Sequence, residues 1–364
     1  LSCPFTKNQL MQQQPWMIYG ANGYTGTLIA HRAVEQGHKP ILAGRTASKV
    51  EPLAQSLGLP HRVFSLDDAE TVAAQIEDCA LVLHAAGPFI HTARTMMEAC
   101  LRSRTHYLDI TGEIPVFERA AALGERAAKS EVMIMPGTGF DVVPTDCMAV
   151  FLKSQLPDAT HLQLAFASQG TRFSRGTALT MAENLGESSA VRQNGAITKV
   201  PLGHKSMTVA FADDFERLVM TIPWGDVSTA YYSSGIPNIE TYTAVHPKTY
   251  RFVKWQKYFG WFLRLPVVKA RARKRVLSGP AGPSAEQRQK GRSLVWGRVA
   301  NDKGETRTAR SVMPEGYALT AMTSVMIAER VLNGQAQPGF QTPAKAYGPD
   351  LLLEVEGAVR EIID

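Results

Sequence analysis

The stretch that decides the fold reads Trp16-Met17-Ile18-Tyr19-Gly20-Ala21-Asn22-Gly23-Tyr24-Thr25-Gly26, and a helix-compatible segment at 27–36 follows it. The apolar run predicts a strand, the glycines a tight turn, and the following segment a helix. Glycine lacks a Cβ, so the turn can form and its backbone can approach a pyrophosphate, which also meets the N-terminus of the helix. The spacing is GxxGxxG, a variant of the commoner GxGxxG. We therefore expect residues 20–26 to bind a dinucleotide; the alternative is a glycine-rich turn without a ligand.

The next predicted strand, at 39–45, ends in an arginine instead of an acid. An NAD-specific site places Asp or Glu here to hold the ribose 2′-hydroxyl. Arg45 can instead pair bidentately with a 2′-phosphate, and Thr46 and Lys49 follow it in the same loop. We therefore expect NADP(H) as the cofactor, bound by Arg45, Thr46 and Lys49. The alternative is a solvated loop arginine.

Four further apolar segments, at 62–66, 80–86, 106–110 and 132–135, alternate with helix-compatible stretches. Six strands that alternate with helices predict an α/β fold, a doubly wound parallel sheet of the Rossmann type. Ligands bind such sheets at the carboxyl ends of the strands.

The loops at that edge supply further cofactor contacts. Asp67 follows the third strand and is expected either near the adenine or at the start of the next helix, and both interpretations stay open. The loop after the fourth strand should lie along the ribose and nicotinamide, and a glycine follows the fifth. These additional candidates are Ala86, Gly87, Pro88, Phe89 and Gly112.

Hydride transfer also needs a proton donor or a group that stabilises developing negative charge. The candidates for this role are Glu113, Tyr107, Asp141 and Arg175. Three of them have an alternative: Glu113 can have a purely structural role, Asp141 can cap the following helix, and Arg175 can be a surface residue. The YxxxK pattern of Tyr250 and Lys254 lies beyond the sheet, so we interpret it as coincidence.

Composition limits the class of protein. The chain has 364 residues, a net charge of +6 and four cysteines without CxxC or metal-type spacing, and we expect no metal. We expect no signal peptide before the first strand, and no apolar run is long enough for a membrane span, so we expect a cytoplasmic protein. The positive charge is concentrated at 264–275, next to the aromatic segment that begins at 250. The 250–275 segment can be a solvated face, a ligand site or a contact with a lipid surface; we expect no nucleic acid.

The pattern changes after the sixth strand, where segments that alternate polar and apolar residues predict half-exposed strands. We expect residues 1–14 to be a disordered tail or sequence added ahead of the native start. The Rossmann domain should cover 15–147, and an α+β substrate or dimerisation domain 148–312. A helical segment at 313–364 should return to the first domain.

The chain resembles a known family through motifs that occur in a fixed order. These motifs resemble the motifs of saccharopine dehydrogenase-like oxidoreductases, most of all those of the group with the trans-acting enoyl reductases. In order along the chain they are GANGYTG, AGR, AAGPF, HYLDITGE, GFDVVPTD, RGT, GYALT and GFQTPA. The resemblance implies a Rossmann domain that binds NAD(P)H, an inserted substrate domain that often forms a dimer, and a returning C-terminal segment. His84 and the triplet at 90–92 depart from the family pattern beside the expected nicotinamide site.

From these residues we expect an NADPH-dependent oxidoreductase that reduces a C=C, C=N or C=O bond of a hydrophobic or lipid-like substrate, as a homodimer. Two alternatives remain open. One is a non-catalytic NADP(H)-binding protein that acts at lipid surfaces or with a partner. The other is an amino-acid C=N dehydrogenase of the saccharopine type.

Overall fold

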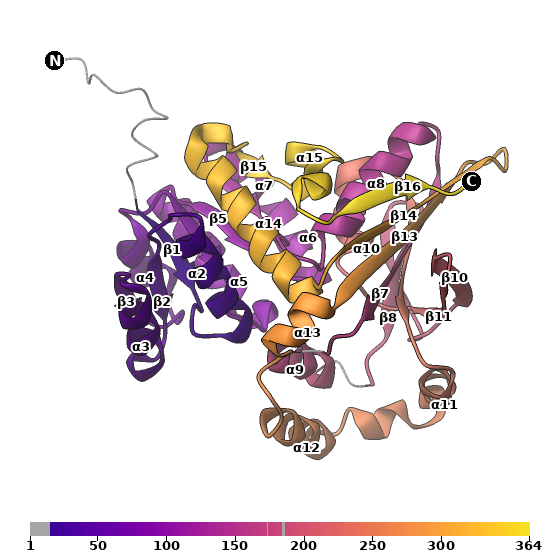
Figure 1. The fold of residues 1–364 in the computed structure, drawn as a ribbon, viewed down its shortest axis with the longest axis horizontal. Helices are drawn as coiled ribbons and strands as arrows, with labels where there is room; N and C mark the ends of the chain where they lie inside the picture. Colours follow the sequence, from indigo (N-terminus) through magenta and orange to yellow (C-terminus); the bar gives the residue numbers. More distant parts are fainter. Residues whose placement is uncertain (1–14, 173, 184–185) are drawn as a thin grey trace. The chain divides into compact units, whose positions relative to one another are not determined.

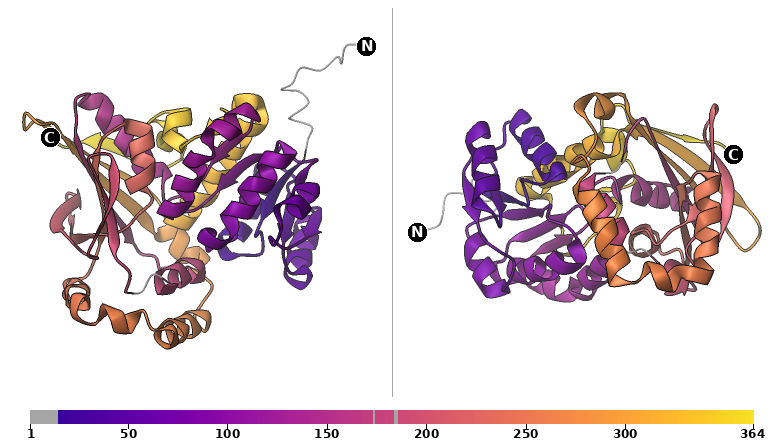
Figure 2. Two further views of the ribbon diagram at one scale, coloured as in Figure 1. Left: turned by 180° about the vertical axis from the view of Figure 1, so that it is seen from behind. Right: turned by 90° about the horizontal axis from the view of Figure 1, so that it is seen from below.

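The computed structural model describes residues 15–172, 174–183 and 186–364, which form two compact units (Figure 1). Unit 1 takes the described residues up to Asp141 together with Tyr317–Ala346, and unit 2 takes Val142–Gly316 and Tyr347–Asp364. The segment 1–14, expected as a tail, lies outside the described residues. Figure 2 gives views from behind and from below.

Unit 1 is built on a parallel sheet of seven strands, in the order β15-β6-β5-β4-β1-β2-β3. Most of these strands are buried on both faces, which explains why their sequences are continuous apolar runs. The predicted doubly wound sheet is confirmed. Its strands are β1 (Trp16–Tyr19), β2 (Ile41–Gly44), β3 (His61–Val63), β4 (Leu81–His84), β5 (His106–Asp109), β6 (Met133–Met135) and β15 (Gly339–Phe340).

Helices of unit 1 connect these strands, and one returns from the C-terminal part of the chain. The returning helix holds the loop after β6, because Thr323 Oγ1 donates to the Thr138 carbonyl at 2.7 Å and the Phe140 N–H donates to Thr320 Oγ1 at 3.0 Å. The helices are α2 (Tyr24–Glu35), α3 (Ala47–Leu57), α4 (Ala69–Ile76), α5 (Phe89–Ser103), α6 (Ile114–Ala122), α7 (Gly124–Lys129) and the returning α14 (Gly316–Arg330), followed by η1 (Val331–Gln335) and α15 (Pro343–Tyr347).

Unit 2 contains a nine-stranded mixed sheet whose main path is β10-β11-β12-β7-β13-β14-β16. Off this path, β8 pairs with β12, and β9 pairs with β8. The β7–β12 pair is parallel, and the other pairs are antiparallel. The strands are β7 (His161–Gln169), β8 (Ser189–Gln193), β9 (Ala196–Val200), β10 (Ser206–Ala212), β11 (Phe215–Thr221), β12 (Asn238–Ala244), β13 (Arg292–Ala300), β14 (Thr306–Pro314) and β16 (Val359–Ile362).

Helix α8 (Val143–Gln155) packs closely on this sheet. A Cβ on Gly297 of β13 would lie 2.7 Å from Met148 Cγ and 2.8 Å from Leu152 Cδ1, so only glycine allows this approach. The other helices of unit 2 are α9 (Arg175–Glu183), α10 (Asp226–Ser234), α11 (Pro247–Leu263), α12 (Pro266–Leu277), α13 (Ala285–Lys290) and η2 (Leu351–Glu354). No helix in the described residues is both long and apolar enough to cross a membrane.

The structure divides the chain at other points than the sequence suggested. Residues 142–147, expected in the Rossmann domain, begin α8 and group with unit 2. Of the segment 313–364, expected to return as a whole, only Tyr317–Ala346 groups with unit 1. Its last strand, β16, pairs with β14 because the edge of that sheet offers a free row of backbone partners.

Three local elements of unit 2 follow from short signals in the sequence. The segment 279–292, rich in Gly, Pro and polar residues, contains α13, which begins with a capping box between Ser284 and Gln287. The aromatic and basic segment that begins at 250 forms two helices instead of one, because Pro266 has no N–H and disfavours helix in the preceding residue. Strands β8 and β9 form a hairpin through Asn194 and Gly195, which both have positive φ, and Asn-Gly is a common signal for such a turn.

Candidate active site

The turn between β1 and α2 is too crowded for any residue except glycine at two positions. Gly20 has φ +83°, and a Cβ there would lie 2.7 Å from the Ala86 nitrogen. A Cβ on Gly26 would lie 2.3 Å from the Gly20 carbonyl oxygen. The Gly20 N–H also donates to the Ala43 carbonyl at 2.7 Å. The turn is thus packed between the end of β2 and the loop after β4.

Helix α2 starts directly after this turn. Gly23 is its N-cap and offers no side-chain acceptor, and no acidic residue lies in the first turn. The positive end of the helix dipole is therefore not neutralised by a side chain of its own first turn. A glycine cradle followed by such a helix start fits a pyrophosphate. The predicted residues Gly20, Ala21, Asn22, Gly23, Tyr24, Thr25 and Gly26 all lie in this cradle.

Gly26→Ala should destabilise the protein although alanine favours helix. The new Cβ must displace the Gly20 carbonyl, and we expect a loss of about 3 kcal/mol in the free energy of unfolding. Gly176→Ala, in α9, is the matched control, because among the described residues its Cβ would meet no atom closer than 3.6 Å. Urea unfolding should show the control unchanged or slightly more stable, and equal effects of both substitutions would contradict the crowding argument.

Arg45 stands at the end of β2, where the cofactor ribose is expected. It is exposed, as is Lys49 in the first turn of α3, and Thr46 is the N-cap of that helix. The strand end lies close to the glycine cradle, since a Cβ on Gly44 would be 2.8 Å from Asn22 Oδ1. Arg45 also lies near the Tyr19 phenol: burial raises the pKa of Tyr19 to about 12, and the Arg45 charge opposes that shift. Arg45, Thr46 and Lys49 thus follow a strand end that lies beside the turn, and their contact with the cofactor stays a prediction.

The two acids after β3 have different surroundings. Asp68 caps α4 and accepts from the Thr71 N–H at 2.8 Å. Asp67 is exposed and accepts a hydrogen bond from the Ser65 hydroxyl. The helix cap therefore falls to Asp68, and Asp67 stays a prediction as an adenine contact.

The loop of Ala86, Gly87, Pro88 and Phe89 is held by a hydrogen-bonded chain that the sequence did not indicate. The Thr92 hydroxyl donates to the Ala86 carbonyl at 2.8 Å, so His84 Nε2, 2.9 Å from the same hydroxyl, must be the donor to it. Burial lowers the pKa of His84 to about 3, and the ring is therefore neutral at physiological pH. His84 therefore acts in this structure as a neutral hydrogen-bond donor that holds the loop through Thr92.

Glu113 binds the start of α5. Its two carboxylate oxygens accept from the N–H groups of Phe89 and Ile90, each at 2.8 Å. These N–H groups are in the first turn of the helix, which has no side-chain cap of its own. This geometry makes Glu113 a positioning residue for the loop after β4.

Glu113→Gln should loosen that loop. The amide keeps the shape but removes the charge from two hydrogen bonds, and we expect a loss of about 2 kcal/mol in the free energy of unfolding. We also expect the Kd of NADPH to rise, because the loop lies at the nicotinamide side of the predicted site. Glu77→Gln, an exposed acid directly after α4, is the control for isothermal titration; a similar rise of the Kd in both variants would contradict the positioning role.

Tyr107 and Asp109 form a buried pair on β5. The Tyr107 hydroxyl donates to Asp109 at 2.6 Å, and the Thr111 and Gly137 N–H groups each donate to the same carboxyl at 2.9 Å. Burial raises the pKa of Asp109 to about 7, although these hydrogen bonds lower it. Burial also raises the pKa of Tyr107 well above its usual value. Tyr107, a predicted catalytic candidate, is thus fully buried and bound to Asp109, and it is Asp109 that joins β5 to the loop after β6.

Asp141 ends that loop and lies against Gly112. A Cβ on Gly112 would be 2.9 Å from Asp141 Oδ2, so the glycine makes room for the carboxyl. Burial raises the pKa of Asp141 to about 7, and the negative charge of Glu113 raises it further. The residue still keeps some exposure to solvent. Asp141 is therefore a carboxyl that can hold a proton near neutral pH and release it.

Other candidates lie in unit 2. Arg175 begins α9 and donates to the Gly279 carbonyl at 2.7 Å, so its guanidinium holds a neighbouring loop. Asp146 is buried in α8 and accepts from Ser233. Burial raises the pKa of Cys147, which keeps this thiol protonated. Lys254 lies 5.5 Å from the centre of the Tyr250 ring on α11, outside the Rossmann unit.

The cradle, the arginine after β2 and the three loops at the carboxyl edge define unit 1 as a dinucleotide-binding Rossmann domain. Residues 16–135 match the family of the saccharopine dehydrogenase NADP binding domain. This match confirms the resemblance seen in the motifs, and it confirms NADP(H), expected from Arg45, as the cofactor of this domain.

Relatives match over part of their length. A saccharopine dehydrogenase-like oxidoreductase from Mus musculus is 27% identical over 167 residues, which are 40% of this chain and 39% of that protein. A trans-acting enoyl reductase from Mycobacterium leprae (strain TN) is 31% identical over 138 residues, 36% of this chain and 33% of that protein. The matched stretches therefore span less than half of these relatives.

A solved structure is similar over nearly the whole chain. The apo, histidine-tagged saccharopine dehydrogenase (L-Glu forming) from Saccharomyces cerevisiae gives a TM-score of 0.65 over 96% of this chain and 100% of that chain. The identity is 14%, so the likeness shows a shared fold.

Proposed function

We propose that this protein is an NADPH-dependent reductase that acts on a C=C, C=N or C=O bond of an apolar substrate. The observation that carries the proposal is the position of Asp141. This proton-holding carboxyl lies on the same carboxyl edge of unit 1 as the NADP(H) loops, next to Gly112 and Glu113. A reduction needs both a hydride and a proton, and this edge supplies a place for each.

Each residue of the site has a distinct task in this proposal. Arg45 pairs with the 2′-phosphate, and the cradle at 20–26 binds the pyrophosphate. Glu113 and the His84–Thr92 pair hold the loop at 86–89 in place. Asp141 donates its proton to the atom next to the carbon that is reduced, and solvent restores that proton. When bound, the nicotinamide supplies the hydride and becomes NADP⁺, which balances the two-electron reduction.

The relatives named as trans-acting enoyl reductases support a C=C bond as the first choice. The fold shared with a saccharopine dehydrogenase supports a C=N bond in an amino-acid substrate as the second choice. The homodimer expected from the resemblance stays a prediction, and sedimentation velocity tests it.

Steady-state kinetics test the proposal. NADPH oxidation should be followed with unsaturated acyl thioesters, imines and ketones, each with short and long alkyl chains. We expect turnover with one bond class, and kcat/KM that rises with chain length. Activity confined to saccharopine-like amines would favour the amino-acid dehydrogenase, and binding of NADPH without any turnover would favour the non-catalytic alternative.

A further inference from the structure

Helices α11 and α12 of unit 2 carry an unusual number of large apolar side chains in contact with solvent. Trp261 is 68% exposed and Val267 is 78% exposed. A soluble protein rarely leaves such side chains grouped on one surface unless something binds there. We call this surface, together with the cations described next, the α11–α12 surface. Its other exposed apolar members are Phe252, Trp255, Phe262, Leu265 and Leu277.

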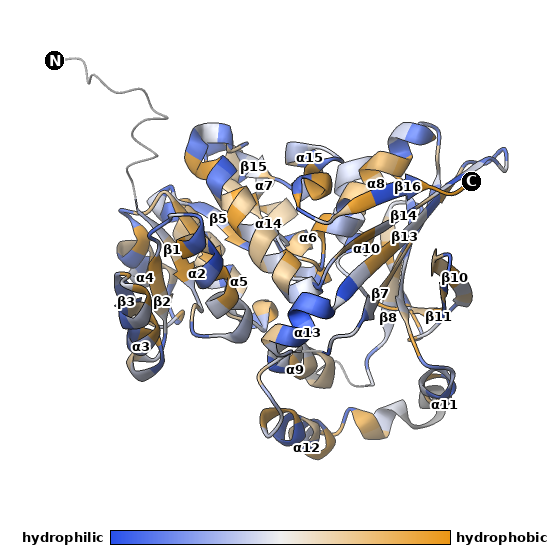
Figure 3. Ribbon diagram, in the orientation of Figure 1, coloured by the Kyte–Doolittle hydropathy of each residue, from blue (hydrophilic) through white to orange (hydrophobic). Residues whose placement is uncertain are grey.

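The same surface is strongly basic. No Asp or Glu occurs between Glu240 and Glu286. Helix α12 has no buried residue at all, so its side chains lie at the surface. Figure 3 shows hydrophilic and hydrophobic residues next to each other along it. Among the residues whose side chains the structure describes, the Lys and Arg residues of the two helices and their junction are Lys248, Arg251, Lys254, Arg264, Lys269, Arg271, Arg273, Lys274 and Arg275.

Only part of this charge is used to hold the helices in place. Lys269 Nζ pairs with Glu187 at 3.0 Å, and Arg264 donates to the Gly186 carbonyl at 2.8 Å. Within the part of the chain that the structure describes, the exposed cations at 271 and 273–275 form no ion pair. The surface is thus anchored to its own unit through residues 186–187 and keeps a cluster of solvent-facing charges.

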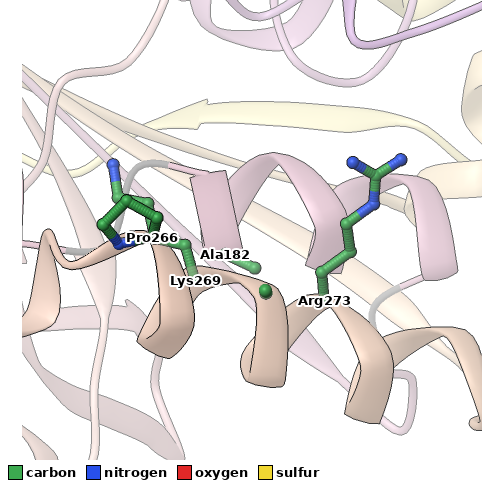
Figure 4. Close-up of a pocket in the computed structure, with 5 residues that line it drawn as sticks. Ala182, Pro266, Lys269 and Arg273 are labelled. Atoms are coloured by element: carbon green, nitrogen blue, oxygen red, sulfur yellow. The ribbon is translucent and has the colours of Figure 1, made fainter.

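A small hollow lies between α12 and α9. It has a volume of about 240 Å³ and is lined by Ala182, Pro266, Lys269, Ala270 and Arg273. Figure 4 shows the Lys269 and Arg273 side chains rising from α12 on either side of Ala182. Arg273 places one cation over this apolar floor, and Lys269, which pairs with Glu187, lies beside it; an anionic headgroup can bind to Arg273 there. The hollow lies in unit 2 and contains none of the residues assigned to the NADP(H) site.

We propose that the α11–α12 surface docks the protein on an anionic lipid bilayer. Exposed Trp, Phe and Leu enter the headgroup boundary, and Lys and Arg bind anionic lipids. The proline break at Pro266 allows both helices to lie along the surface, as the view from below suggests (Figure 2). A protein partner is less well matched, since lysine is depleted from the centres of protein interfaces. The proposal does not depend on the reductase function.

Vesicle co-sedimentation of the full chain tests this. We expect binding to vesicles of phosphatidylcholine with phosphatidylglycerol, little binding to phosphatidylcholine alone, and release at high salt. The variant Arg271→Gln/Lys274→Gln/Arg275→Gln should lower the partition coefficient about 100-fold, since each charge near the surface contributes substantially. The matched control, Lys39→Gln/Lys129→Gln/Lys199→Gln, removes three exposed charges elsewhere and should bind as the wild type does.

A second pair of variants tests the apolar part. Trp261→Ala should lower binding about tenfold, whereas Val359→Ala, an exposed apolar residue on β16, should not. NADPH binding confirms that each variant is folded. Absence of wild-type binding to anionic vesicles, or equal binding to neutral ones, overturns the proposal. Retention on immobilised poly-glutamate without vesicle binding would assign the cations to an acidic protein partner instead.

Discussion

Arg45→Glu is expected to raise the Kd of NADPH at least 100-fold and to leave the Kd of NADH nearly unchanged. The guanidinium lost from the end of β2 would pair with the 2′-phosphate, and charge-assisted hydrogen bonds of this kind are among the strongest in proteins. A carboxylate in its place repels that phosphate but can accept a hydrogen bond from the 2′-hydroxyl of NADH. Fluorescence titration of both nucleotides measures the switch.

The matched control for this experiment is Lys129→Glu. Lys129 is exposed at the end of α7, which leads into the amino end of β6, so it lies away from the carboxyl edge. The same reversal of charge there should change neither Kd. An equal loss of affinity for NADPH and NADH in Arg45→Glu would show that Arg45 does not bind the 2′-phosphate.

Asp141→Asn is expected to lower kcat by about 100- to 1000-fold with little change in the Kd of NADPH. The proposed proton donor is lost, and general acid catalysis contributes effects of this size. In the wild type, burial raises the pKa of Asp141 to about 7, so the acid is protonated below that pH. The rate should therefore fall as pH rises through about 7, and the residual rate of the variant should lose this dependence.

Asp68→Asn is the control for Asp141→Asn. Asparagine caps a helix as well as aspartate does, so α4 should be unaffected and kcat should stay at the wild-type value. If Asp141→Asn retains full activity, or keeps the wild-type pH profile, another group supplies the proton.

The sequence was sufficient for the first six strands of unit 1, because most of them are buried on both faces, whereas the two-residue strand β15 was not predicted. Strands buried on both faces are continuous apolar runs, and the glycine turn and Arg45 lie at fixed places after two of them. In unit 2 the long hairpin of β13 and β14 was also predictable, from its alternation and its turn at 302–304. Strand β16 was not, since four residues carry no signal for the sheet they will join.

The roles of individual side chains at the site were harder to predict. Glu113 looks like a catalytic acid in sequence, but its carboxylate reaches N–H groups more than twenty residues earlier in the chain. The link from His84 through Thr92 to Ala86 likewise depends on how β4 and α5 meet in space. The position of a residue between predicted strands and helices can assign it to a loop. The atoms that its side chain contacts depend on the three-dimensional fold.

Isotope transfer tests the central claim most directly. Wild-type protein is incubated with NADPH that carries deuterium on the transferred position of C4, together with the substrate panel, and the products are examined by mass spectrometry. The account predicts one deuterium atom in the reduced product of one bond class, and a strongly reduced yield with Asp141→Asn. Tight binding of NADPH with no deuterium in any product would contradict the claim that this protein is a reductase.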